Sequence, residues 1–94
     1  MSDSTQSNPR MVEGLEITPS SDGYIVYQQD KERVHYLNQT AAIVLELCNG
    51  RNSTMEIPEL IRDAFDLSSP PVLEVKACLE GLQREGLIVI HTDK

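Results

Sequence analysis

Tryptophan is absent from this sequence of 94 residues, and hydrophobic residues make up only 39% of it. A chain of this length forms one domain with a thin core and modest stability. Because the largest aromatic side chain is missing, we expect the core to consist mostly of aliphatic residues.

Basic residues are also scarce. Eight Lys and Arg stand against 15 Asp and Glu, so the net charge is −7. Such a chain repels phosphate backbones and anionic membranes, and neither nucleic acid nor a membrane is expected as its partner. The longest apolar stretch, Thr40 to Cys48, is too short to span a bilayer. No basic region followed by an apolar core marks a secretory signal, so we expect a cytoplasmic protein.

The groups that catalysis or metal binding needs are few and scattered. His35 and His91 are the only histidines, and neither has a carboxylate at a diagnostic spacing. No glycine-rich phosphate loop and no cluster of metal ligands is present. Cys48 and Cys78 lie outside any Cys-x-x-Cys spacing, in apolar helical contexts where a thiol usually packs in the core. We therefore expect no catalytic residue, no cofactor and no metal.

Short runs of β-branched and aromatic residues predict three strands in the first half of the chain. The first includes Leu15 and Ile17, the second covers Tyr24 to Gln28, and the third covers Arg33 to Leu37. The turn cluster from Pro19 to Gly23 separates the first two. Short links favour an antiparallel meander, with the second strand in the centre and the third at an edge.

Sequence signals typical of helices follow directly after the third predicted strand. Asn38 is a suitable N-cap for a helix that runs to about Cys48 and ends at Asn49-Gly50. Ser53 and Glu56 match a capping box that opens a second helix.

A third helix is expected to begin with Ser69 as its cap and Pro70 at its first position. It should end at Gly86, before the apolar run Leu87 to Ile90. The fold class is therefore α+β, a three-stranded antiparallel meander followed by a three-helix winged helix-turn-helix unit. We expect a disordered tail over residues 1–10, one domain over residues 11–91 and a C-terminal tail over residues 92–94.

Winged helix-turn-helix units often bind DNA, so the charge of the third helix is relevant to function. From Pro71 to Glu85 the chain has three acidic and two basic residues, so this helix would repel phosphates. A winged-helix transcription regulator, or a protein-interaction module on that scaffold, remains the alternative interpretation.

The same helix has two apolar faces. One stripe, expected to face the core, consists of Val72, Val75, Leu79 and Leu82. A second face, with an apolar centre and charged margins, consists of Leu73, Lys76, Ala77, Glu80 and Arg84. Such a face suits a peptide groove, although Leu73 could equally pack against the preceding loop.

Three segments together resemble the PqqD-like family, which is named after a small protein of pyrroloquinoline quinone biosynthesis. They are Val34 to Ala42, Leu45 to Gly50, and Leu82 to Ile88. The likeness covers about Leu15 to Ile90, and it combines a Leu-Asn-x-Thr-Ala-Ala signature with a later Cys-x-Gly.

The resemblance implies a recognition element for ribosomally made, post-translationally modified peptides. Members of the family bind the leader of a precursor peptide and present it to a modifying enzyme, often a radical S-adenosylmethionine protein. The leader adds as a strand to the third strand and lies in the groove beside the third helix. Carried onto this chain, the peptide-binding residues are Arg33, Val34, His35, Tyr36 and Leu37 on one side, and Leu73, Lys76, Ala77, Glu80 and Arg84 on the other.

Overall fold

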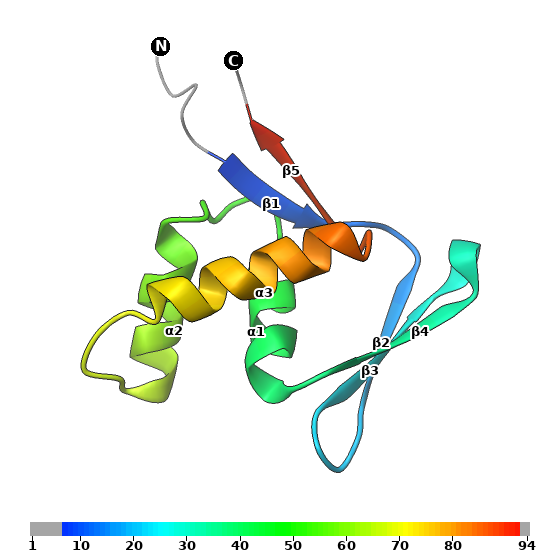
Figure 1. Cartoon of the computed structure of the whole chain (residues 1–94), viewed down its shortest axis with the longest axis horizontal. Helices are drawn as coiled ribbons and strands as arrows, with labels where there is room; N and C mark the ends of the chain where they lie inside the picture. The colour runs from blue at the N-terminus through cyan, green and yellow to red at the C-terminus, as the bar shows by residue number, and fades with distance from the viewer. Residues whose placement is uncertain (1–6, 93–94) are drawn as a thin grey trace.

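The structure is a computed structural model that describes residues 7–92 of the chain. Over these residues it has two antiparallel sheets and three α-helices in a flat body of 39 × 33 × 18 Å (Figure 1). None of the helices in residues 7–92 is both long and apolar enough to cross a membrane. The elements are β1 Ser7–Met11, β2 Leu15–Pro19, β3 Tyr24–Gln28, the 3-10 turn η1 Gln29–Lys31, β4 Arg33–Leu37, α1 Gln39–Leu47, α2 Glu56–Phe65, α3 Val72–Arg84 and β5 Ile88–Thr92.

The predicted meander is confirmed. Its strand order is β2-β3-β4, and both pairs are antiparallel. β3 is the central strand and β4 lies at an edge, as the short connections predict. Three helices follow this sheet, so the α+β class is confirmed, whereas the winged helix-turn-helix description of the second half stays a prediction. In Figure 1 the meander extends to one side of the helical body, and β4 leads directly into α1.

The caps of the first two helices are confirmed. The side chain of Asn38 accepts a 2.8 Å hydrogen bond from the amide of Ala41. Ser53 and Glu56 exchange bonds between side chain and backbone amide, at 2.8 and 3.1 Å. Gly50 has a φ of +84°, a left-handed conformation that glycine adopts without strain.

The predicted start of α3 is wrong by two residues. The helix begins at Val72, and Ser69 does not cap it. The reason is the second proline, because the residue before a proline is disfavoured in the helical region and Pro70 precedes Pro71. The amide of Val75 donates to the carbonyl of Pro71 at 3.0 Å.

The end of α3 is confirmed at Gly86, which has a φ of +79°. The amide of Leu87 donates to the carbonyl of Leu82 at 2.9 Å, and that of Gly86 donates to Gln83 at 3.0 Å. These two bonds form a Schellman motif, which turns the chain sharply into β5.

The expected N-terminal tail over residues 1–10 is partly wrong, because Ser7 to Arg10 belong to β1. This strand pairs with β5 and forms a second, two-stranded sheet. The pairing also places Thr92 in β5 rather than in a C-terminal tail. β1 is anchored further by the amide of Met11, which donates to the carbonyl of Cys48 at 2.7 Å. The rest of both expected tails, residues 1–6 and 93–94, lies outside the described residues.

The core lies where the three helices, β3 and β5 meet, and it is aliphatic as expected. Cys48 is part of it, whereas Cys78 is only half-buried. One member of the predicted stripe of α3 is wrong: Val72 is 55% exposed because it stands at the first residue of the helix. The core consists of Val26, Val44, Leu45, Cys48, Ile57, Ile61, Val75, Leu79, Leu82, Leu87 and Ile88.

Candidate functional site

A cleft of about 480 Å³ lies between β4 and the C-terminal half of α3. Apolar side chains of Leu37, Leu82 and Leu87 contribute to its walls, and charged groups of Arg84 and Glu85 stand beside them. The full lining is Val34, His35, Tyr36, Leu37, Ala41, Cys78, Gly81, Leu82, Arg84, Glu85 and Leu87.

The cleft runs along the free edge of the sheet. β4 pairs with β3 on one side, and among residues 7–92 no strand pairs with its other edge. Alternate amides and carbonyls of such an edge lack sheet partners and can pair with a strand from another chain. The site therefore combines main-chain bonding groups with a side-chain cleft beside them.

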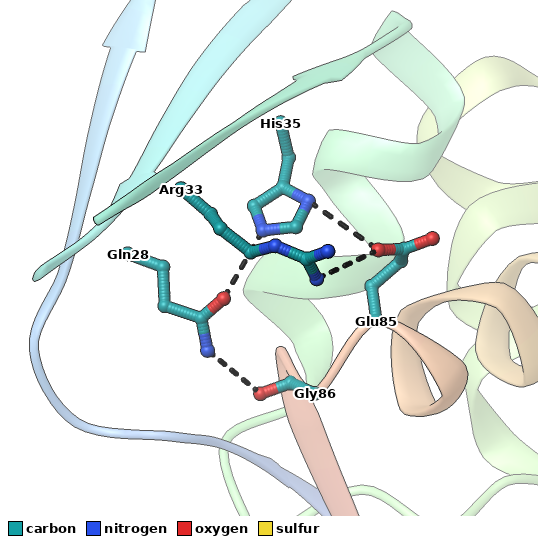
Figure 2. Close-up of polar contacts among 5 residues, drawn as sticks. All are labelled: Gln28, Arg33, His35, Glu85 and Gly86. Atoms are coloured by element: carbon teal, nitrogen blue, oxygen red, sulfur yellow. Dashed lines mark hydrogen bonds and ion pairs between the residues drawn. The ribbon is translucent and has the colours of Figure 1, made fainter. Parts of the chain in front are cut away.

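A polar network lies at one end of the cleft, where two of its members, His35 and Glu85, line the wall (Figure 2). Gln28 lies on β3 and is only 2% exposed. Its Nε2 donates to the carbonyl oxygen of Gly86 at 3.3 Å, and its Oε1 lies 3.1 Å from Nε2 of His35. Because the amide nitrogen of Gln28 is the donor to Gly86, its oxygen must accept, and His35 donates from Nε2. The network thus ties β3 and β4 to the end of α3.

Glu85 sits at the outer side of this network. Its Oε1 lies 3.8 Å from Nδ1 of His35 and 3.9 Å from the guanidinium of Arg33. Both distances exceed those of direct hydrogen bonds. The carboxylate is about half exposed, so it keeps acceptor positions available at the end of the cleft.

Gly81 occupies the middle of the cleft wall on α3. Glycine in a helix interior is about 1 kcal/mol less favourable than alanine. A Cβ added here would meet no atom within 4 Å, and the residue has no positive φ, so neither packing nor backbone geometry requires glycine. Its effect is to leave the cleft open.

The two thiols are not activated nucleophiles. Burial raises the pKa of Cys48 to about 12. Burial and, secondarily, the nearby charge of Glu74 raise the pKa of Cys78, which lines the cleft. A reactive cysteine needs a lowered pKa, because the thiolate is the nucleophile. Within residues 7–92, no group of three or more His, Cys, Asp and Glu is placed to hold a metal ion.

The structure brings together the strand half of the predicted site. Val34, His35, Tyr36 and Leu37 all border the cleft, and Arg84 of α3 borders it from the opposite side. Arg33 lies at its end, beside Glu85.

Of the five α3 residues in the predicted site, only Arg84 lines the cleft beside β4. Lys76 and Glu80 line a different cleft of about 360 Å³, which also contacts α2 and β5. Leu73 is 81% exposed, Ala77 is exposed, and neither lines either cleft.

Beside Leu82 and Arg84, the cleft wall opposite β4 includes three residues that the prediction did not name: Cys78 and Gly81 of α3 and the residue that follows the helix, Glu85. The prediction missed these three because it looked for apolar residues off the core stripe, whereas they are a thiol, a glycine and a carboxylate. The one available signal was Gly81 itself, a glycine inside a helical pattern without a local structural reason.

Residues 23–88 match the family model described as Coenzyme PQQ synthesis protein D (PqqD). The match covers most of the chain, so the chain belongs to the PqqD family. It includes β3, β4, the three helices and the first residue of β5. A search of curated proteins and a search of solved structures found no match.

Proposed function

We propose that this protein is a non-catalytic adaptor that binds the leader of a ribosomally made precursor peptide and presents it to a modifying enzyme. Its family points to the synthesis of coenzyme PQQ or to a related peptide pathway. A radical S-adenosylmethionine protein is the class of modifying enzyme that we expect. The observation that carries the proposal is that an open cleft lies directly along the edge of β4 that pairs with no strand in the described part of the chain.

The chemistry of an edge strand supports peptide addition at β4. An extended peptide would form main-chain hydrogen bonds with β4, which supply much of the affinity. Side chains of an added strand alternate between its two faces, so every second one would enter the cleft beside α3. The apolar wall of Leu37, Leu82 and Leu87 favours a large apolar side chain there.

The polar end of the cleft would recognise a charged or amide group of the same peptide. Arg84 and Arg33 can donate to a carboxylate, and Glu85 can accept from a cation or a main-chain amide. Gly81 widens the passage between the apolar wall and these charges. Specificity therefore depends on the spacing between one apolar and one polar residue of the leader.

Calorimetric titration tests the proposal, with the leader of a precursor peptide encoded beside this gene. We expect a dissociation constant between nanomolar and micromolar, about −12 to −8 kcal/mol. The protein alone should leave the peptide chemically unchanged by mass spectrometry. Absence of binding heat with every neighbouring leader, while circular dichroism shows a folded protein, would overturn the proposal.

A further inference from the structure

The meander has a second face, which points away from the helices. On β3, Val26 and Gln28 are buried, so the alternating residues Ile25 and Tyr27 point outward. Tyr36 lies directly opposite Ile25, and Val34 lies opposite Tyr27. These four side chains are therefore neighbours, and we call them the outer patch.

The outer patch is unusually apolar for a face exposed to solvent. Tyr36 is 78% exposed and Val34 is 49% exposed. The outer face of an antiparallel sheet usually carries polar residues. β2 follows that rule with Glu16 and Thr18, which lie beside Tyr27 and Ile25. Both outward positions of β3 and both of β4 break it.

Acidic residues surround the outer patch. Glu16 borders it on β2, Asp22 lies in the hairpin between β2 and β3, and Asp30 and Glu32 lie in the turn between β3 and β4. No cation within residues 7–92 forms an ion pair with any of these four carboxylates.

Two cations near the β3–β4 turn, Lys31 of η1 and Arg33 at the start of β4, lie on the opposite side of the sheet. Arg33 approaches Glu85, at 3.9 Å. The Nζ of Lys31 lies close to Gly86, 3.2 Å from the position of an added Cβ. The margin of the outer patch therefore keeps its negative charge.

A hollow of about 420 Å³ adjoins the outer patch at the β2–β3 hairpin. Asp22, Ile25 and Tyr36 are among the residues that line it. Gly23 allows the hairpin to lie close to β4, because a Cβ at this position would overlap the carbonyl oxygen of Leu37. An Arg or Lys side chain from another molecule could lie along Ile25 and Tyr36 and reach the carboxylate of Asp22.

We propose that the outer patch docks a second protein whose surface has an apolar centre and a basic margin, with one Arg or Lys inserted between Asp22 and Tyr36. The inference rests on the proposed function, under which this partner is the enzyme that modifies the bound peptide. A second copy of this chain fits poorly, because the acidic margins of two such patches would repel each other.

The position of the patch would also couple the two binding events. A peptide strand added to β4 extends the same sheet, so half of its side chains would stand on the outer face beside Val34 and Tyr36. The partner would then contact the patch and the peptide together. Binding of either should strengthen binding of the other by the same factor.

The test uses the peptide-modifying enzyme encoded beside this gene, with its affinity measured by calorimetry for three variants. Ile25→Thr/Tyr27→Thr removes the apolar centre from β3 while keeping β-branched strand formers. Asp22→Asn removes the charge of the hollow alone. Met55→Gln is the control, because it removes an exposed apolar side chain just before α2, outside the outer patch and both clefts.

We expect the first two variants to bind the enzyme about tenfold more weakly or worse, and the control to match the wild type. Wild-type binding should also weaken as salt is added. All variants should keep the leader affinity of the wild type, and Asp22→Asn and the control should also keep its thermal midpoint. The double variant should fold with a lower midpoint, because Ile25 and Tyr27 are partly buried. If the wild type does not bind the leader, the proposed function is overturned instead.

Three results would overturn the docking proposal. The first is enzyme affinity unchanged in both patch variants, and the second is no enzyme binding by a wild type that binds the leader. The third is self-association of the wild type in sedimentation that the patch variants abolish, because the occupant would then be a second copy.

Discussion

Nε2 of Gln28 donates a 3.3 Å hydrogen bond to the carbonyl oxygen of Gly86, and this bond joins the centre of the meander to the end of α3. The contact spans 58 positions of sequence. It fixes one end of the cleft, because β4 lies beside Gln28 and α3 ends just before Gly86. The shape of the cleft therefore depends on a buried side chain that does not line it.

Replacement of Gln28 by Ala should destabilise the domain and weaken peptide binding. The change removes the bonds to Gly86 and His35 from a buried position, which costs about 1–3 kcal/mol. Urea denaturation followed by circular dichroism measures this loss. The matched control is Gln29→Ala, which removes an exposed bond to Glu16 and should change stability by less than about 0.5 kcal/mol. Equal losses in both variants would contradict the structural role of Gln28.

Substitutions at Gly81 should separate stability from binding. Gly81→Ala should stabilise the protein by up to about 1 kcal/mol, because it improves helix propensity without a steric clash. Gly81→Phe should fill the cleft and abolish leader binding in a folded protein. Thermal denaturation and calorimetry measure the two effects.

Ala77→Phe is the matched control for Gly81→Phe, since it adds the same ring to an exposed position of α3 outside the cleft. It should bind the leader normally. The opposite pattern, in which Ala77→Phe loses binding and Gly81→Phe keeps it, would show that the peptide lies on the helix face predicted from the sequence.

Thiol labelling should distinguish the two cysteines. At pH 8 the thiol of Cys48 is protonated, because burial raises its pKa to about 12, so a disulfide reagent should not modify it until the protein unfolds. Cys78 is half-buried in the cleft and should react slowly, and bound leader should protect it. In urea both should react at the same rate. Modification of Cys48 in the native protein, or no protection of Cys78 by a leader that binds, would contradict these positions.

Local signals predicted the three strands of the meander and the three helices in the correct order. Alternation defined the meander, Asn38 marked the start of α1, and the pair Ser53 and Glu56 marked that of α2. These features act within a few residues, so a single sequence contains them. β1 was missed because the segment Ser7–Met11 contains a proline and has no apolar alternation. It is a strand because β5, at the other end of the chain, pairs with it.

The site shows the same difference between features set by local signals and features set by tertiary packing. The edge position of β4 follows from short connections, so the strand half of the cleft could be predicted. The predicted core stripe of α3 is buried at Val75, Leu79 and Leu82, and only Val72 is exposed. The stripe does not show which of the remaining helix positions face β4. Cys78, Gly81 and Glu85 give no hydrophobic period, and only tertiary packing shows that they face β4.

Hydrogen exchange at β4 tests the central claim most directly. In the free protein, the alternate amides of Arg33 to Leu37 that point away from β3 should exchange quickly, because no strand of residues 7–92 covers that edge. Addition of a saturating leader peptide should protect those amides, while the amides bonded to β3 keep the protection they already have. If the leader binds and the outward amides of β4 exchange as fast as before, the peptide does not add as a strand to this edge.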